Sequence, residues 1–516
     1  MKKRCNNLPR RDVASSGTLG FDILSINQWV VVIDRGLPHV WGSERIGDSL
    51  GRYSFGGMAQ VAWILRLVEA GAGGDDRGTE VMEVAKPDDL CDIANLGLSL
   101  AEAKQVLAAI QREVVAAQAR DHAARRPNCR SCGGACHVKD YRQHRIATLF
   151  GQVSVRLPRF RCIACDGIEN GVDWPSRCRS TPELDRLQAN LSALMSYRTA
   201  ADVLEQMFPI DAGKDHETLR RHTLALGEQL RHRPVIVPAT PSAAISVSVD
   251  STFIRSCEEG RRHLEVKVGN AETDAGGRQV FAAVAGSDTD LVALIGRTLD
   301  SVGRTGATVL TGFTDGCAGL RLILAAAGVS APPILDWFHI AMRLQHLEQT
   351  AGALSTDTPA RQQAKALIVA EADRLRWRLW NGKAKDAQVS IERIRKVLHA
   401  FQGEVAERPS RVPSSRKLWT ALLALDGYLV GQADWTVNYA ERHRAGLRVG
   451  TAITEGTANF LVNRRMNKSQ QMRWTRRGAD LLLQVRCAVY NGTFGSDFGQ
   501  RFLPANDIHP GFAAAA

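Results

Sequence analysis

The sequence predicts an α/β protein whose mixed β-sheet, with crossover connections, is interrupted by a helical insertion and preceded by smaller modules. Between residues 245 and 338, three strand-like segments are followed by a helix, a strand, a helix and a fifth strand. This order is typical of a mixed sheet. Residues 340–448 have an almost wholly helical pattern, too long for a loop inside a compact domain. Two C-x-x-C pairs flank a short hairpin pattern earlier in the chain.

Length and composition restrict the class of protein. The 516 residues are enough for three or four domains, and 44% hydrophobic with 23% charged residues is close to a globular average. The net charge of +12 favours a polyanionic partner, with nucleic acid first and an acidic membrane surface second. The best apolar run, Met58–Val68, is too short for a transmembrane helix and contains Gln60 and Arg66. The first residues lack the apolar core of a secretory signal, so we expect a cytoplasmic protein.

The first 125 residues carry little recognisable chemistry. Residues 1–95 contain apolar runs at Ile23–Ile33 and Met58–Val68 but no motif that indicates a role. A long helix is predicted from Leu98 to Arg125 because its apolar residues repeat at helical spacing.

Four cysteines predict a zinc ribbon. Cys129 and Cys132 form one C-x-x-C pair, Cys162 and Cys165 form the second, and 29 residues separate the pairs. Two short strands, 145–150 and 153–157, are expected around a Gly151-Gln152 turn. Two such pairs suit tetrahedral Zn²⁺ better than a redox centre, although Cys136 could replace Cys132. Residues 125–161 hold nine Lys or Arg and one acid, a net +8 that indicates phosphate-backbone contact or a solvated charged surface.

Residues 181–232 are predicted to form three helices. They cover Leu187–Met195, Arg198–Met207 and a third helix that begins at an Asp215 N-cap and runs to Leu230. The third helix would display Thr218, Arg220 and Arg221, so the segment is a candidate DNA-binding helix-turn-helix. An ordinary helical hairpin is the alternative, because the pattern is short.

The sheet pattern follows a Pro-rich linker. The expected strands are Ile245–Val249, His263–Gly269, Gln279–Ala285, Ala307–Phe313 and Pro333–Phe338, with helices at Leu291–Val302 and Leu320–Ala327. An RNase H-like core begins with elements in this order. The insertion is predicted to contain helices at Arg343–Leu354, Thr358–Trp380, Ala384–Phe401 and Trp419–Leu429.

Two late helices carry a basic stripe. One is expected from Thr454 to about Met466 and the other over Thr475–Tyr490. The stripe outnumbers one acid, Asp480, by six and is expected to hold a nucleic-acid backbone; its members are Arg464, Arg465, Lys468, Arg473, Arg476, Arg477 and Arg486. The residues chosen as DNA contacts are Arg464, Arg465, Lys468, Arg476 and Arg477. Trp474 packs in the core or stacks on an exposed base.

Three acids occupy positions that suit metal binding. Asp250 and Asp315 each follow a predicted strand, and Glu455 opens a late helix. Carboxylates at the ends of adjacent strands project into one crevice, and a cluster of them suits Mg²⁺. The alternative is that the two aspartates are turn residues and that the glutamate interacts with the helix dipole. Asp336 also ends a predicted strand and is the alternative to Asp315 as the second acid. Asp315 is preferred, and Asp336 and His339 are expected to support or line the site.

Several segments resemble bacterial insertion-sequence transposases of the DDE class. They are Val249-Asp250-Ser251-Thr252, Phe313-Thr314-Asp315-Gly316, Leu335-Asp336-Trp337-Phe338-His339, Thr454-Glu455-Gly456, Arg464-Arg465-Met466 and Trp474–Leu482. The chain is most similar to the ISKra type, which is related to the Mutator-like enzymes. The resemblance covers roughly residues 100–490, and the order of the segments is more specific than any one of them.

The resemblance implies a fold, an activity and a set of partners. Asp250, Asp315 and Glu455 would be the catalytic triad and would bind Mg²⁺ or Mn²⁺ in an RNase H-like core. The enzyme would cleave DNA at the terminal inverted repeats of the element and transfer the strand to target DNA. It would act in the bacterial cytoplasm, associated with the nucleoid, as a homo-oligomer because two ends must be joined. The alternatives are a nuclease or integrase with the same core, or a catalytically inactive DNA-binding remnant.

The expected organisation therefore has seven regions. They are an N-terminal region of unknown role (1–95), a long helix with the zinc ribbon (96–180), the helix-turn-helix (181–235), the first part of the core (240–345), the insertion (346–448), the second part of the core with the catalytic glutamate (449–495) and a tail (496–516).

Overall fold

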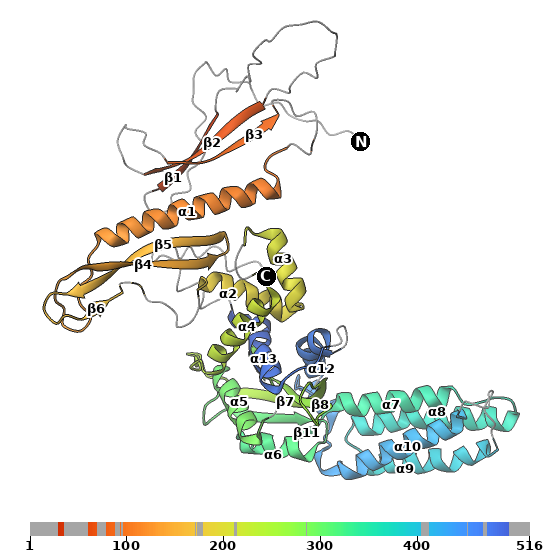
Figure 1. The fold of residues 1–516 in the computed structure, drawn as a ribbon. Helices are drawn as coiled ribbons and strands as arrows, with labels where there is room; N and C mark the ends of the chain where they lie inside the picture. The colour runs from red at the N-terminus through yellow and green to blue at the C-terminus, as the bar shows by residue number, and fades with distance from the viewer. Residues whose placement is uncertain are drawn as a thin grey trace, which may run out of the picture. The chain divides into compact units, whose positions relative to one another are not determined.

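Two compact units make up the chain. The computed structural model describes residues 29–35, 60–69, 79–87, 93, 96–170, 172, 179–210, 214–284, 286–403, 412–450, 452–467 and 472–494 (Figure 1). Unit 1 consists of Met1–Thr181 with Leu204–Gly213, and unit 2 of Pro182–Val203 with Lys214–Ala516.

Unit 1 begins with a three-stranded antiparallel sheet that the sequence did not predict. Its strands, in the spatial order β1-β2-β3, are β1 (Trp29–Arg35), β2 (Gln60–Glu69) and β3 (Thr79–Pro87). Helix α1 (Leu100–Ala124) confirms the predicted long helix, and its Val106 packs on Leu65 and Val84 of the sheet. Ser99 and Glu102 form a capping box at the start of α1, which satisfies its first free backbone N–H groups.

The cysteine-containing part of unit 1 is a second three-stranded sheet. Its strands are β4 (Cys136–Thr148), β5 (Gly151–Cys162) and β6 (Ile168–Glu169), in the order β4-β5-β6. The predicted hairpin exists, but its strands are longer and its turn is at residues 149–150 rather than at Gly151-Gln152. Gly151 instead opens β5 with a φ of 104°, a conformation that favours glycine.

Unit 2 contains the predicted mixed sheet, with strand order β11-β10-β7-β8-β9. Its strands are β7 (Ala244–Arg255), β8 (His263–Thr273), β9 (Arg278–Val284), β10 (Val309–Thr314) and β11 (Ile334–Leu335). The first three strands pair antiparallel, whereas β10 runs parallel to β7 and β11 parallel to β10. The mixed α/β prediction is therefore confirmed. The predicted end of the first strand is wrong, because β7 continues five residues past Asp250.

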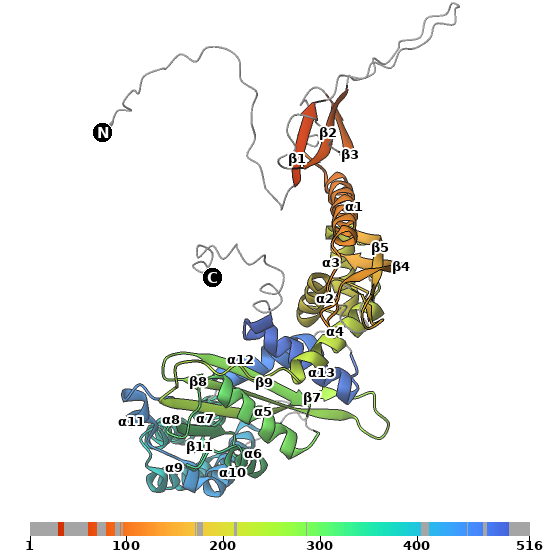
Figure 2. The same cartoon turned by 90° about the vertical axis from the view of Figure 1, so that its left-hand side faces the viewer.

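Helices cover both faces of this sheet (Figure 2). Helices α5 (Asp288–Ser301) and α6 (Ala318–Ala326) pack on the face formed by alternate β7 residues such as Val247 and Val249. The opposite face packs against α12 (Ala452–Ala458), the π-helix η4 (Asn459–Asn467) and α13 (Arg476–Tyr490). Because strand side chains alternate, Ser248 and Asp250 belong to this second face.

The helical insertion forms a bundle beside the sheet (Figure 1). It comprises α7 (Trp337–Gly352), α8 (Pro359–Trp380), α9 (Ala384–Val397), η2 (Leu398–Phe401), α10 (Ser414–Gly431), η3 (Ala433–Trp435) and α11 (Tyr439–Arg444). Phe313 and Leu335, at the ends of β10 and β11, belong to the hydrophobic core of the bundle. The bundle is therefore continuous with the carboxyl ends of these strands.

The region predicted as a helix-turn-helix contains α2 (Pro182–Leu194), α3 (Tyr197–Met207) and α4 (His216–Arg231), with Asp215 as the expected N-cap. In unit 2, α2 and α4 pack against α13, so α4 presents its buried face to the helix that covers the sheet. Gly227 lies at this contact. A Cβ atom there would come within 2.3 Å of the backbone oxygen of Leu481.

We expect Gly227→Ala to destabilise unit 2 by about 1–3 kcal/mol, because α4 and α13 must separate to accept the methyl group. Gly427→Ala in α10 is the matched control, since nothing lies within 4 Å of its added Cβ. There the helix propensity of alanine should raise stability by about 0.5–1 kcal/mol. Thermal unfolding of both variants checks the prediction, and equal shifts would contradict it.

Candidate active site and metal centre

The four predicted cysteines converge. The Sγ atoms of Cys129, Cys132, Cys162 and Cys165 all lie within 4.8 Å of one another. Cys129 is 3.5 Å from Cys165, and Cys132 is 3.5 Å from Cys162. Four sulfurs bound tetrahedrally to Zn²⁺ at about 2.3 Å would be about 3.8 Å apart. The residues present therefore fit a structural zinc ion, which they would hold as a Cys₄ site.

The two C-x-x-C pairs adopt the same backbone structure. Cys129 N donates to Gly134 O, and Cys162 N donates to Gly167 O, both at 2.9 Å. The residue after each second cysteine has a positive φ, 71° at Gly133 and 61° at Asp166. Such a turn points successive backbone N–H groups at a cysteine sulfur. Cys136, the alternative ligand, is outside the group and donates instead to Gly134 O at 3.9 Å.

Electrostatics also favour a cation among these sulfurs. Backbone N–H groups of Cys165 and Ala164 lower the pKa of the Cys162 thiol to about 6, against the opposing effect of burial. The pKa of Cys165 is lowered by the N–H of Gly167 but raised to about 12 by its three cysteine neighbours. Four adjacent thiolates cannot coexist without a positive charge, and a divalent metal supplies it.

Three aspartates form a row across the parallel strands of unit 2. The last pair between β10 and β7 is Phe313 with Ser248, and continuing that register by two residues would set Asp315 opposite Asp250. Thr314 pairs with Leu335, which places Asp315 beside Asp336 as well. Neighbouring strands lie about 4.8 Å apart. The predicted proximity of Asp250 and Asp315 stays a prediction, because the paired register ends two residues before both aspartates.

Asp336 differs from its two neighbours in being fully buried. Its Oδ1 accepts a hydrogen bond from Phe338 N at 2.9 Å and caps α7, and its Oδ2 is 3.6 Å from His339 Nε2. Asp250 and Asp315 are only half-buried. This difference supports the preference for Asp315 over Asp336 as a metal ligand, with Asp336 and His339 in a supporting position.

Glu455 belongs to α12, but its side chain lies outside the described residues. The preceding Thr454 is buried, and its Oγ1 is 2.5 Å from Ser248 Oγ, which donates to Asn270 Oδ1 at 2.6 Å. This chain of hydrogen bonds joins α12 to the face of the sheet that carries Asp250. Among the described side chains, a group of three or more possible metal ligands occurs only at the four cysteines, so Asp250, Asp315 and Asp336 do not come together as such a group.

Thr454→Val is expected to lower the stability of unit 2 by about 1–3 kcal/mol, because it removes the buried hydrogen bond to Ser248 Oγ and leaves that hydroxyl with Asn270 alone. The control is Thr420→Val on the exposed side of α10, where the hydroxyl bonds only to its own helix. That change should stay within about 0.5 kcal/mol. Chemical denaturation of the two variants measures the difference, and a silent Thr454→Val would show that the hydrogen bond does not hold α12.

Residues of the insertion contact the Asp315 turn, which sequence reasoning did not predict. Tyr428 Oη donates to the backbone oxygen of Asp315 at 2.9 Å, and Gln432 Nε2 donates to Gly316 O at 3.2 Å. Burial raises the pKa of Tyr428, so its hydroxyl remains a donor. Arg321 hydrogen-bonds Gln432 and stacks 3.5 Å from the ring of Trp435. The sequence carries no signal for these contacts, because more than 110 residues separate the partners.

The basic stripe is only partly available to a ligand. Arg465 is 1% exposed; it donates to Ser192 O at 3.0 Å and lies over the rings of Tyr197 and Trp474. The prediction that Arg465 contacts DNA is therefore wrong in this fold. Trp474 is also buried, and its Nε1 donates to Met466 O at 3.1 Å, so it packs in the core rather than stacking on a base.

The remaining predicted DNA contacts differ in exposure. Arg464 and Arg477 are exposed, with Arg477 3.1 Å from Glu228, and Arg476 is half-buried. Lys468 lies outside the described residues. On α4, Arg220 and Arg221 are exposed and Thr218 is half-buried. Arg220 forms a two-pronged ion pair with Glu217, at 2.8 and 2.6 Å, so its charge is locally compensated.

No protein-family model matches this chain, and no curated protein has significant sequence similarity to it. In the part of the chain that the structure describes, no helix is both long and apolar enough to cross a membrane.

Proposed function

We propose that the protein is a DNA transposase of the DDE class with an RNase H-like catalytic core. The observation that carries the proposal is the parallel pairing of β10 with β7, which continued by two residues would set Asp315 opposite Asp250. Thr454 of α12 is hydrogen-bonded to Ser248 of β7, on the sheet face that carries Asp250. The order of elements along the chain, β7-β8-β9-α5-β10-α6-β11, supports the core, because an RNase H-like core is expected to begin with elements in this order. The bundle between β11 and α12 supports the predicted insertion before the catalytic glutamate.

The donor set suits a hard divalent cation. Asp250 and Asp315 are half-buried carboxylates on one sheet edge, and such oxygen ligands favour Mg²⁺ or Mn²⁺. They would hold the metal together with Glu455. When bound, Mg²⁺ would stabilise charge on the attacking and leaving oxygens of a phosphodiester. Tyr428 and Gln432 would fix the turn that presents Asp315, and the buried Asp336 would fix the start of α7 beside it.

Binding of DNA is assigned to basic surfaces of both units. The +8 of residues 125–161, the exposed Arg220 and Arg221 of α4, and Arg464 with Arg477 are the candidates for contact with phosphates of the terminal repeats. Zn²⁺ would hold the ribbon in shape rather than take part in the chemistry. A homo-oligomer is proposed because joining two ends to target DNA requires two bound ends.

Incubation of the purified chain with a labelled fragment of its element's terminus and Mg²⁺ or Mn²⁺ tests the proposal. A nick at the element boundary, followed by joining of the freed end to a second duplex, is the expected result. Cleavage without joining would support a nuclease. Binding without any nick, in either metal, would support an inactive DNA-binding remnant and overturn the enzymatic proposal.

A further inference from the structure

The tip of the β7–β8 hairpin forms a basic pocket, and of its arginines only Arg473 belongs to the basic stripe predicted from the sequence. The pocket has a volume of about 770 Å³ and lies where the hairpin meets the residues that precede α13. Its charged lining consists of Arg255, Glu258, Glu259, Arg261, Arg262 and Arg473, with His263 beside them.

Hydrogen bonds fix the two segments that build the pocket. Trp474 N donates to Arg255 O, and Cys257 N donates to Trp474 O, each at 3.0 Å. Trp474 itself is buried, which anchors the segment that carries Arg473. Glu258 Oε1 accepts from Arg476 N at 2.7 Å and so ties the hairpin to the start of α13. The arginines therefore project from a backbone that is held by hydrogen bonds between the two segments.

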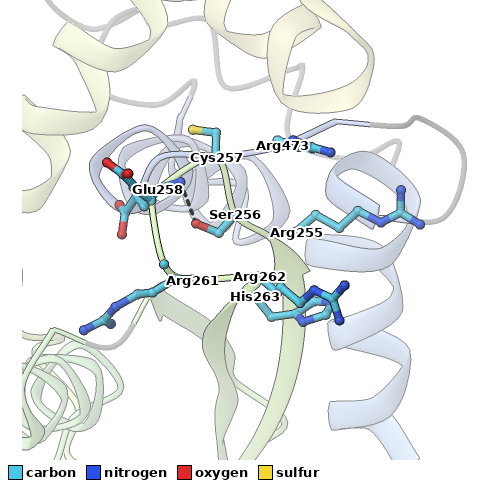
Figure 3. A pocket seen from close by; sticks show the side chains of 10 residues that line it. Arg255, Ser256, Cys257, Glu258, Arg261, Arg262, His263 and Arg473 are labelled. Atoms are coloured by element: carbon cyan, nitrogen blue, oxygen red, sulfur yellow. Dashed lines mark hydrogen bonds between the residues drawn. The ribbon is translucent and has the colours of Figure 1, made fainter.

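The lining of the pocket has a net positive charge, because four arginines stand against Glu258 and Glu259. Arg255, Arg261, Arg262 and Arg473 are all exposed, and within the described part of the chain none of them forms an ion pair with a carboxylate. Figure 3 shows Arg255 and Arg262 extending to one side of the hairpin with His263, whereas Arg261 extends to the opposite side. Exposed arginines elsewhere in unit 2, such as Arg220 and Arg477, are by contrast paired with glutamates.

The pocket lies at a defined distance from the aspartate row. Arg255 is five residues beyond Asp250 in the same strand, which corresponds to about 17 Å at the usual rise of a β-strand. Beyond Asp250 the hairpin has no partner in β10, whose pairing with β7 ends at Phe313–Ser248. A duplex rises about 3.4 Å per base pair, so this distance spans about five base pairs.

We infer that the hairpin pocket binds the phosphate backbone of duplex DNA about five base pairs from the position held at Asp250 and Asp315. The inference rests on the proposed function for the identity of that DNA. Guanidinium groups suit this ligand because each can donate two parallel hydrogen bonds to a phosphate. Such contacts position a duplex without reading its sequence.

The test uses the double variant Arg255→Gln/Arg262→Gln, which removes two charges from one side of the hairpin. Its control is Arg416→Gln/Lys417→Gln, which removes two exposed charges from α10 in the same unit. Binding to a labelled duplex is measured between 50 and 200 mM salt. We expect the slope of log K against log salt to become shallower by about 1.8, and affinity at 100 mM to fall about tenfold or more. The control should match the wild type.

Failure of this inference is distinguishable from failure of the proposed function. If the wild type cleaves terminal DNA and the hairpin variant keeps its affinity and salt slope, the pocket inference is overturned and the enzyme stands. If no protein cleaves DNA but the variant still loses affinity and salt slope, the pocket binds DNA and the transposase proposal fails. Equal losses in the hairpin and control variants would show a general charge effect, which also overturns the pocket.

Discussion

Asp315→Asn should abolish DNA cleavage, with a rate at least about 1,000-fold below that of the wild type, equivalent to about 4 kcal/mol of activation free energy. The change replaces one oxygen and removes the charge that would hold Mg²⁺. It should preserve the fold, because Asp315 is half-buried. Cys317 N donates to Asp315 Oδ1 at 2.9 Å, and the side-chain oxygen of asparagine can accept the same hydrogen bond. Asp250→Asn should have an effect of the same size, since the proposed site uses both carboxylates and the register of β10 with β7, continued by two residues, would set them opposite each other.

The matched control is Asp274→Asn. Asp274 is an exposed acid just after β8, beside the amino-terminal end of β7, where its N donates to Ala244 O at 3.1 Å. This variant should cleave like the wild type, and all three variants should bind terminal DNA equally well. Cleavage rates and binding are measured on the same labelled duplex. Unimpaired cleavage by either Asp250→Asn or Asp315→Asn would exclude the aspartate pair as the catalytic site.

Asp336→Asn tests whether Asp315 or Asp336 is the second acid of the catalytic site. Asparagine caps helices about as well as aspartate, so α7 should still begin at this residue. We expect this variant to keep measurable cleavage activity, because the buried carboxylate contacts Phe338 N and His339. If Asp336→Asn abolished cleavage while Asp315→Asn did not, the assignment of the second acid would be reversed.

Periodicity in the sequence predicted the elements of the sheet better than their ends. The alternation of Ile245–Val249 marks β7, but the strand continues through a more polar stretch to Arg255 because β8 pairs with it that far. The parallel pairing of the strands that precede Asp250 and Asp315 could be predicted, because crossover connections through helices produce parallel neighbours. The contact of Tyr428 with Asp315 could not, because it depends on how the bundle packs.

Buried arginines show a second limit of prediction from sequence. Arg465 and Arg486 lie in a basic stripe, and arginine is rarely fully buried, so both suggest a surface. In the fold, Arg486 donates to Leu461 O at 2.7 Å and to Phe460 O within the π-helix. Burial lowers its pKa to about 9. These guanidinium groups satisfy backbone oxygens and stack on aromatic rings, which no local pattern indicates.

Removal of zinc should unfold the cysteine end of the ribbon. The core there is small: Cys129, Cys136, Phe160 and Cys162 are its buried members, with Val138 packed against them. Metal binding in zinc fingers is worth about 10–16 kcal/mol, which exceeds what so few apolar side chains contribute. A strong chelator should therefore expose the chain around both C-x-x-C pairs to protease and leave the sheet of unit 2 intact.

Cys132→Ser tests the ligand set with little loss of packing, because Cys132 is exposed whereas Cys129 and Cys162 are buried. We expect it to bind less than one zinc ion per chain and to show the proteolysis pattern of the chelated wild type. Cys136→Ser is the control, since its sulfur is outside the group of four. It should retain one zinc ion per chain, with at most a modest loss of stability from the buried hydroxyl. If Cys136→Ser lost the metal and Cys132→Ser kept it, the alternative ligand would be correct. If neither variant lost the metal, the four sulfurs would not be a zinc site, because a tetrahedral ion that loses a ligand is bound more weakly.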